Sequence, residues 1–552
     1  MTQNSASANT IKFLNGLSVL FFLLFVIAQP TFVTDIWWQL RLGDQIRLTH
    51  QIPTRDVYSW TCFHRPIVLH EWGSYLAFAE AYRYLGGWSG LWLFQAVLTA
   101  VVLLGLYHLI LHRIPDNPFV AMVLTVLAGH MCGKFLAPRP HLFTYVCLIL
   151  SLEILFYCQY KKVTVAAVVL LAAVQVFWAN THAAGPIFIG ISLTYAVGNA
   201  LQLLIYKSAK DPLEIEARRR TVVSLSCAAI AVLALMVNPS GWDIYKIIFD
   251  TVGNKTMPSS IGEWLPVNFH DPYGQQVEIL MFVIGFVLAA TKRSKDIGDV
   301  FVLGVLVLAA LYALRNVPIL ALAGTLILAP YIPSAIQSIL DRFRNMTILR
   351  TFFFNDSPSF AITAAALTAV VFAGAFLGTV LPEGKAASHP LEAVAEAAYM
   401  VHNVPEDGCL FLEREKVPTS LRLYNNYDDG AYLIWRLPQY PVFSSTETFV
   451  YFGPVLDAYF TMDHLPLDWR SVIAPYDIGL VLTTSVDRQA RLFLDAPEWA
   501  LVYAGGLPAD DQKPVTLIFV RRSPANSALI VRSRKDCLNV SLLKSAGYLS
   551  AQ

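Results

Sequence analysis

Two acidic residues follow the first long apolar stretch of the chain, and both lie in sequences that could do chemistry. Asp35 opens the run TDIWWQLRLGD, and Glu71 follows His70 in the run VLHEW. Two carboxylates and an imidazole on one surface could act as general bases or bind a divalent metal ion. The spacing of these residues matches no specific metal-ligand pattern, so a divalent metal is possible but is the weaker expectation.

Asp35 also has a purely structural interpretation. Aspartate is a favoured N-cap, so Asp35 could cap an amphipathic helix over Ile36–Leu48. Trp37 and Trp38 would then belong to an aromatic belt at the membrane–water interface. Taken alone, the sequence around Asp35 favours the N-cap interpretation. The presence of Glu71 and His70 in the same loop favours a catalytic or metal-binding role.

Arginine and histidine occur in two clusters that could bind an anion. Arg139 lies between two prolines in PRPH, which ends with His141, and Arg315 lies in ALRNVP. The prolines fix the backbone, and a guanidinium binds phosphate in a fork. The alternative for each arginine is a charged helix end that extends to the membrane interface, and the sequence leaves both interpretations open.

Two further polar clusters end or precede apolar stretches. WANTH contains Asn180 and His182 and is followed by small residues, which allow a ligand or another backbone to approach closely. Hydrogen bonding between helices is the favoured interpretation for Asn180, and substrate binding is favoured for His182. Glu263 in GEW is first a solvated loop acid and second a substrate-binding residue.

The composition indicates what must position these residues. The 552-residue chain is 56% hydrophobic and only 14% charged, whereas soluble domains carry about 25% charged residues. This predicts a polytopic membrane protein. The net charge of +1 gives no reason to expect a nucleic-acid partner. The seven cysteines are scattered and form no CxxC pair, so neither a disulfide framework nor a cysteine metal site is expected.

A membrane-spanning helix needs roughly 20 mostly apolar residues, and by that rule the chain contains about eleven candidates. They lie near Phe13–Ala28, Leu91–Leu111, Phe119–Phe135, Leu142–Tyr160, Val163–Trp178, Ile187–Tyr206, Val222–Val237, Val277–Ala290, Val300–Leu314, Pro318–Ile332 and Phe360–Val380. The sequence therefore predicts a polytopic α-helical domain over residues 1–382, with a long first extracytoplasmic loop over residues 31–87.

The character of the chain changes after Leu381. Residues 383–552 contain charges, turns and short apolar runs, which predict a soluble α/β or α+β domain. Its expected strands are CLFLERE, AYLIWRL, IGLVLTT and LIFVRRS. Asp428-Asp429-Gly430 is interpreted as a turn that enters a strand, because Asp-Gly is a hairpin signal.

Basic residues in short loops predict the orientation. Lys161–Lys162, Arg218–Arg220 and Lys292–Lys295 fall in alternate loops, which places these loops and the N-terminus in the cytoplasm and the C-terminal domain outside. The other set of loops then brings the polar clusters to one face of the membrane. Asp35, Glu71, Arg139, His141 and His182 are expected to border one cavity there, since polar residues at membrane depth usually mark a site.

The ordered set DIWWQLRLGDQI, HEW, RPHLFT, WANTH, NPSGW, EW and NNYDDGAYLIW resembles bacterial multi-pass proteins of the GT-C glycosyltransferase superfamily. The resemblance covers most of the chain. It implies that the acid of the first extracytoplasmic loop, here Asp35, is the catalytic base or a metal-linked acid. Glu71 is then the second acid, with His70 beside it.

The resemblance implies glycosyl transfer from a polyprenyl-phosphate-linked sugar to a glycan, lipid or protein acceptor at the bacterial inner membrane. Arg139, Arg315 and His141 would stabilise the departing lipid phosphate. One alternative is a glycan ligase or polymerase with a lipid-pyrophosphate donor, for which more basic residues are expected. Another is a non-catalytic scaffold or transport component; a transporter would usually show inverted repeats and broken helices, and neither is recognisable in the sequence.

The predicted orientation can be tested by cysteine labelling. In a background without the seven native cysteines, a membrane-impermeant maleimide should label Asp271→Cys in intact cells and should label Arg219→Cys only after the membrane is opened. Labelling of Arg219→Cys from the outer face would contradict the orientation.

Overall fold

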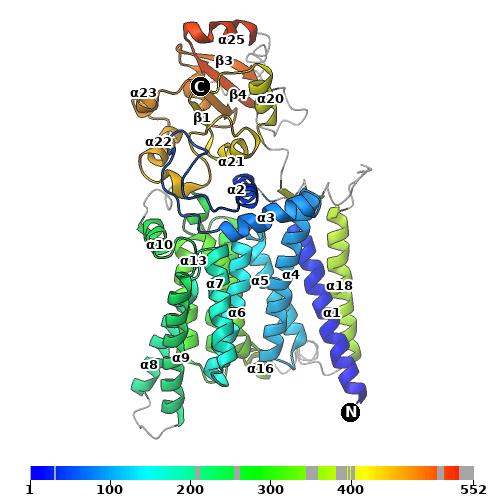
Figure 1. The fold of residues 1–552 in the computed structure, drawn as a ribbon. Coiled ribbons are helices and arrows are strands. Elements are labelled where there is room, and N and C mark those ends of the chain that lie inside the picture. The colour runs from blue at the N-terminus through cyan, green and yellow to red at the C-terminus, as the bar shows by residue number, and fades with distance from the viewer. Residues whose placement is uncertain are drawn as a thin grey trace. The chain divides into compact units, whose positions relative to one another are not determined.

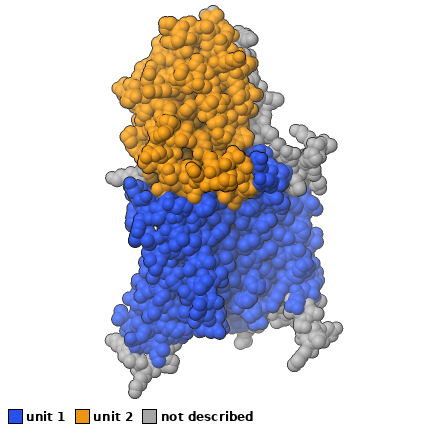
Figure 2. All heavy atoms as spheres, viewed as in Figure 1, with its two compact units in different colours: residues 1–31, 70–74, 81–399 blue, residues 32–69, 75–80, 400–552 orange. Residues whose placement is uncertain are grey.

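The fold is seen in a computed structural model that describes residues 2–29, 31, 33–205, 212–253, 261–342, 358–380, 394–395, 398–399, 404–505 and 515–533 (Figure 1). These residues form two compact units (Figure 2). Unit 1 contains residues 1–31, 70–74 and 81–399, and unit 2 contains residues 32–69, 75–80 and 400–552. The predicted domain boundary at residues 382–383 lies outside the described residues.

Unit 1 is a helical bundle, and the described part of each of the eleven apolar stretches falls mainly on helical structure. Its longer helices are α1 (Thr2–Ile27), α4 (Trp88–Arg113), α5 (Pro118–Cys132), α6 (His141–Tyr160), α7 (Val165–Thr181), α8 (Pro186–Ile205), α9 (Pro212–Leu235), α10 (Asp243–Gly253), α12 (Pro272–Ala290), α13 (Ile297–Tyr312) and α18 (Pro358–Val380). In Figure 1 the long helices run alongside one another, with α1 next to α18.

Among the described residues, seven helices are long and apolar enough to cross a membrane: α1, α4, α5, α6, α8, α12 and the helical run Leu314–Arg342. Large apolar side chains on these and neighbouring helices are exposed, among them Phe282 at 71% and Leu308 at 66%. Lipid would cover such surfaces, so the chain is a membrane-embedded helical protein. The count of eleven spans stays a prediction.

The run Leu314–Arg342 is helical but irregular. The short elements η3 (Leu314–Asn316) and α14 (Val317–Ile319) lead into a π-helical turn, η4 (Leu320–Gly324). The run continues through α15 (Thr325–Leu328), η5 (Ala329–Tyr331) and α16 (Ile332–Arg342). Isolated π turns inside helices occur frequently at functional sites. The sequence does not predict this irregularity, and Arg315 lies at the start of the run.

Helices α8 and α13 approach closely through two glycines. A Cβ atom added at Gly198 of α8 would lie 2.7 Å from the Cα atom of Gly298 of α13. Small residues at such crossings let the backbones of membrane helices come together.

Unit 2 contains a four-stranded mixed sheet in the order β1 (Leu423–Asn425), β2 (Leu480–Thr484), β4 (Thr516–Arg521) and β3 (Trp499–Ala504). Strands β1 and β2 are parallel, and the other two pairs are antiparallel. Its helices are α2 (Ile36–Thr49), α20 (Glu406–Arg414), α21 (Tyr427–Arg436), α22 (Pro454–Asp463), α23 (Trp469–Ile473), α24 (Ala490–Leu494) and α25 (Ser527–Arg532), and α3 (Trp72–Tyr84) is shared between the units.

The segment that leads up to residue 69 packs with the C-terminal residues of unit 2. The indole N–H of Trp60 donates to the carbonyl oxygen of Leu423 at 2.8 Å, and the Thr61 hydroxyl donates to the carbonyl oxygen of Phe443 at 2.6 Å. Residues far apart in the sequence therefore share one core.

Two of the four predicted strands are confirmed and two are wrong. IGLVLTT and LIFVRRS overlap β2 and β4, whereas CLFLERE and AYLIWRL overlap α20 and α21. Both helices are amphipathic and carry acidic residues in their first turns, where a helix favours negative charge. The short apolar runs did not distinguish these helices from strands.

The predicted turn at Asp428-Asp429-Gly430 is also wrong, because these residues form the first turns of α21. The side chain of Asn426 caps the helix by accepting the backbone N–H of Asp428 at 2.8 Å. The backbone of Ser444 approaches position 430 so closely that only glycine fits, since an added Cβ atom would lie 2.1 Å from the carbonyl oxygen of Ser444.

Gly198→Ala should destabilise the protein by about 1–3 kcal/mol, because the added methyl group forces α8 and α13 apart. Gly190→Ala is the matched control on the same helix, since nothing lies within 4 Å of a Cβ atom there. Thermal unfolding of both purified variants in the same detergent measures the difference. Equal unfolding midpoints would show that the glycine crossing does not constrain the bundle.

Candidate functional site

Five separate segments of unit 1 bring polar side chains together at one end of the bundle. His70 and Glu71 precede α3, Arg139 and His141 lie at the start of α6, and His182 follows α7. The remaining two are Glu263 in the short helix η2 (Gly262–Trp264) and Arg315 in η3. The helix ends place these side chains where the chain turns between apolar helices.

Glu71 and His182 form a buried pair of an acid and an imidazole. Their Oε1 and Nε2 atoms are 3.1 Å apart, and the two residues are only 9% and 7% exposed. His70 lies on the same carboxylate, with its Nε2 atom 3.6 Å from Oε1. A carboxylate accepts hydrogen bonds, so Nε2 of His182 carries the proton that it donates to Glu71.

A chain of hydrogen bonds fixes the tautomer of His182. Burial and the positive charges around the ring hold the pKa of His182 well below its ordinary value of 6.5, so the ring is neutral and its Nδ1 atom accepts. The Thr144 hydroxyl lies 2.5 Å from Nδ1 and in turn accepts the indole N–H of Trp178 at 2.9 Å. Trp178 and Thr144 therefore hold His182 in the form that donates to Glu71.

His141 connects this pair to the arginines. Its ring centroid lies 4.7 Å from that of His182. Arg315 Nη2 is 2.9 Å from His141 Nε2, and because arginine only donates, Nε2 accepts and the neutral ring carries its proton on Nδ1. That Nδ1 atom is buried and finds no hydrogen-bond partner among the residues that the structure describes. It is a donor available to a ligand.

Glu263 lies between the two arginines. Its Oε2 atom is 2.9 Å from Arg139 Nη1, and its Oε1 atom is 3.6 Å from Arg315 Nη1. Burial would raise the pKa of Glu263, but the charges of Arg139 and Arg315 outweigh it and lower the pKa below the ordinary 4.5. The Arg315 guanidinium also lies 4.2 Å from the ring centroid of Trp264. The leading interpretation of Glu263 as a solvated loop acid is therefore wrong.

Asn180 holds the site together through its amide. Its Nδ2 atom donates to the carbonyl oxygens of Val176 and Val237, both at 2.8 Å, and its Oδ1 atom accepts the indole N–H of Trp72 at 3.0 Å. Its contacts join α7, the segment after α9 and the start of α3. These bonds favour a positioning role for Asn180 over the contact with substrate that its motif also allowed.

Asp35 belongs to unit 2, where it precedes α2. It occupies the N-cap position, but its side chain makes no capping hydrogen bond, so the side-chain cap expected from the sequence is absent. Trp37 packs against Tyr432 and Trp435, and Trp38 against Tyr75, with both tryptophans no more than 6% exposed. They are core residues, and their expected place in an aromatic belt is wrong.

The donor set does not favour a metal ion. Within the described residues, no group of three or more His, Cys, Asp or Glu side chains is arranged to hold one. Glu71 accepts a hydrogen bond from the Nε2–H group of His182, and Glu263 faces two guanidinium groups. A cation would have to displace these donors.

The arrangement combines a carboxylate held by an imidazole with two arginines that share one counter-charge. The sequence identified Glu71, His141, His182, Arg139 and Arg315 as candidates but missed the roles of Thr144 and Trp178. Thr144 lies in the motif HLFT and Trp178 in the motif WANTH. The motifs therefore contained both residues, but the sequence does not show which side chains contact each other.

The fold is similar to that of oligosaccharyltransferase AglB from Archaeoglobus fulgidus, solved with an inhibitory peptide and a dolichol-phosphate. The TM-score is 0.51 at 13% sequence identity, over 87% of this chain and 70% of that chain. Structures of the A. fulgidus oligosaccharyltransferase in the apo form and with Zn and sulfate align with TM-scores of 0.47 and 0.39, also at 13% identity. The apo alignment covers 85% of this chain and 69% of that chain, and the Zn and sulfate alignment covers 87% and 69%.

No family model matches the sequence, and no curated protein is similar to it in sequence. The likeness to AglB, an enzyme of the GT-C superfamily, shows that the chain has a GT-C-like fold.

Glu263→Gln should destabilise the protein, because Arg139 and Arg315 then lose their shared counter-charge. A loss of about 1–3 kcal/mol is expected, less than for a fully buried pair, since the Glu263 side chain is 23% exposed. The exposed Glu278 provides the control Glu278→Gln, which should leave stability nearly unchanged.

The same variant should change the pH dependence of stability. The pKa of Glu263 is lowered below 4.5 in the folded protein, so its charge stabilises the fold above that pH and this contribution is lost as the pH falls through the lowered pKa. Between about pH 5 and pH 3 the unfolding midpoint of the wild type should fall more steeply than that of Glu263→Gln. Parallel curves would rule out Glu263 as the shared counter-charge.

Proposed function

We propose that the protein is a membrane glycosyltransferase that moves a sugar from a polyprenyl-phosphate-linked donor to an acceptor hydroxyl at the membrane surface. One observation carries the proposal: the acid–imidazole pair Glu71–His182 lies directly beside His141, which contacts Arg315, through the 4.7 Å approach of the His141 and His182 rings. The GT-C-like fold supports it, because the structure similar to this chain was solved with a dolichol-phosphate.

Arg139, Arg315 and the Nδ1–H of His141 would bind the phosphate of the donor. Arg139 and Arg315 both face Glu263, so two guanidinium groups lie beside one carboxylate near the apolar helix ends. A guanidinium binds phosphate in a fork, and a buried donor without a partner gains most from meeting an anion.

Glu71 would act as the general base. The acceptor hydroxyl gives its proton to the Glu71 carboxylate while its oxygen forms a bond to the anomeric carbon of the sugar. The bond between that carbon and the phosphate oxygen breaks, and the electron pair leaves with the lipid phosphate. The phosphodiester monoanion becomes a monoester dianion, and Arg139 and Arg315 stabilise the added negative charge. A single displacement of this kind inverts the anomeric configuration.

His182 is a positioning residue in this scheme. Its Nε2–H holds one carboxylate oxygen of Glu71, and Thr144 and Trp178 hold the ring. Asp35 remains a second proposed acid, carried over from the family resemblance. Asp35 belongs to unit 2, and the variant Asp35→Asn tests its role.

The lipid-pyrophosphate alternative demands more positive charge, because a pyrophosphate carries an additional anionic group. Two arginines that already share a carboxylate suit a monophosphate better. The basic loops predict that the reaction takes place at the outer face of the membrane. The family resemblance is the reason for proposing a bacterial inner membrane. The acceptor would be a glycan, a lipid or a protein.

Glu71→Gln should lower kcat by about 10²–10⁴-fold, because the amide cannot accept the proton while the shape of the side chain is kept. The assay supplies purified protein in lipid vesicles with candidate polyprenyl-phosphate sugars and measures glycan product per folded protein. Glu278→Gln is the control with the same chemical change at an exposed position and should keep full activity. Full product formation by folded Glu71→Gln protein would exclude Glu71 as the base, and a loss confined to Asp35→Asn would assign the base to Asp35. Absence of product from the folded wild type with every candidate donor would favour the scaffold alternative.

Arg315→Ala should raise KM for the donor and also lower kcat. A contact with the donor phosphate is made in the ground state and strengthens as charge develops in the transition state. Arg218→Ala is the control, since this arginine lies on α9 with its side chain 71% exposed and should leave both constants unchanged. An unchanged KM for Arg315→Ala would exclude Arg315 from donor binding.

A further inference from the structure

Unit 1 contains a second polar region at the opposite end of α6. The candidate site lies at His141, where α6 begins, and a cavity of about 1010 Å³ lies at Tyr160, where α6 ends. A helix of 20 residues separates the two by about 30 Å. Helices α4, α6, α8, α9 and α13 and the segment before α13 contribute its walls. Nothing in the proposed glycosyl transfer uses this cavity.

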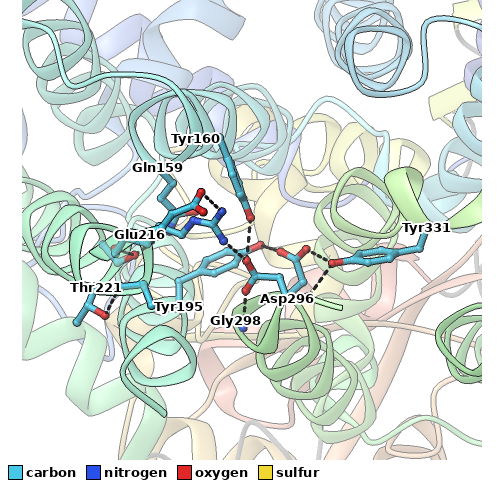
Figure 3. A network of polar contacts seen from close by, with 12 residues as sticks. Gln159, Tyr160, Tyr195, Glu216, Thr221, Asp296, Gly298 and Tyr331 are labelled. Atoms are coloured by element: carbon cyan, nitrogen blue, oxygen red, sulfur yellow. Dashed lines mark hydrogen bonds and ion pairs between the residues drawn. The ribbon is translucent and has the colours of Figure 1, made fainter. Parts of the chain in front are cut away.

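Three of the four acidic side chains that line the cavity accept hydrogen bonds. Arg220 forms ion pairs with Glu216 and Asp296, and Asp296 also accepts the Tyr160 hydroxyl at 3.3 Å (Figure 3). Asp299 accepts two tyrosine hydroxyls, from Tyr195 at 2.8 Å and Tyr331 at 2.6 Å.

The cations of the cavity are less fully used. Six Lys and Arg residues but four Asp and Glu residues line it. Lys161, Lys162, Arg293 and Lys295 are exposed at its rim and form no ion pair with any residue that the structure describes. The cavity therefore presents excess positive charge to whatever enters it.

Two arginines inside the cavity also carry unused donors. The Nε atoms of Arg113 and Arg220 are buried and have no acceptor within the described part of the chain. The Arg113 guanidinium lies 4.0 Å from the ring centroid of Phe156, and its ion pair with Glu153 spans 3.7 Å. A buried N–H without an acceptor is costly, so an anion that reaches into the cavity would satisfy both groups.

The surroundings of the rim indicate where the anion comes from. Two valines that follow Lys162 are exposed, Val163 at 54% and Val165 at 81%, and Phe301 of α13 is 41% exposed. A membrane protein exposes such side chains to lipid. Basic pockets between membrane helices on the cytoplasmic side bind anionic lipid head groups, and the basic loops predict that this end faces the cytoplasm.

We propose that this cavity binds the phosphate of an anionic lipid, with Lys161 and Lys295 at the rim and the guanidinium groups of Arg113 and Arg220 within it. The shared chemistry is a phosphate anion, and a soluble phosphate is the other possible source. Binding would join the ends of α4, α6, α9 and α13 at this face of the bundle.

The test compares two double variants that remove the same charge. Lys161→Gln/Lys295→Gln removes two rim cations, and Arg218→Gln/Lys292→Gln removes two exposed cations that do not line the cavity. Purified full-length protein in detergent is titrated with phosphatidylglycerol, with phosphatidylcholine or with inorganic phosphate. Native mass spectrometry counts bound lipid, and tryptophan fluorescence follows thermal unfolding.

The wild type and the control variant should retain phosphatidylglycerol in preference to phosphatidylcholine and unfold at a higher temperature when it is bound. The rim variant should bind it on the order of tenfold more weakly. Stabilisation by inorganic phosphate at similar concentrations, lost in the rim variant, would support the phosphate site with a soluble source. An equal loss in both double variants, or equal retention of the two lipids by the wild type, would overturn the proposal.

Discussion

The sharing of one carboxylate by two arginines is the constraint on which the candidate site depends. Arg139 and Arg315 lie at helix ends that enter apolar surroundings, and two guanidinium groups there repel each other unless an acid lies between them. Glu263 supplies that acid and so joins η2, η3 and the start of α6. This arrangement places His141 against His182, and His182 in turn holds Glu71. An acid–base pair and a cationic group thus become neighbours.

The sequence predicts the members of this site better than their partners. Histidine, arginine and acidic side chains stand out at the ends of apolar stretches, because their burial is costly unless it serves a purpose. Glu71, Arg139, His141, His182 and Arg315 were identifiable for that reason. The role of Glu263 was not, because the pairing depends on which loops meet in three dimensions. Asp35 was assigned to the same cavity from its position in the first loop; it belongs to unit 2, and that assignment stays a prediction.

The fold shows the same division. Long apolar helices are predictable from length and composition, and the helical membrane domain agrees with them. The short apolar runs of the C-terminal residues were ambiguous, so β2 and β4 were confirmed while α20 and α21 were mistaken for strands. The side chain of Asn426 caps the first turn of α21 and so favours a helix over a strand there. The close approach of Gly430 to Ser444 is visible only in the folded unit. The π turn at Leu320–Gly324 likewise has no signal in the apolar pattern.

The most direct test of the central claim is an experimental structure of the protein in a lipid nanodisc with a bound polyprenyl phosphate. We expect the phosphate to contact Arg315 and the Nδ1 atom of His141, with the open side of the phosphate facing Glu71. A phosphate bound away from both arginines, with the contacts among Arg139, Glu263 and Arg315 intact, would contradict the account.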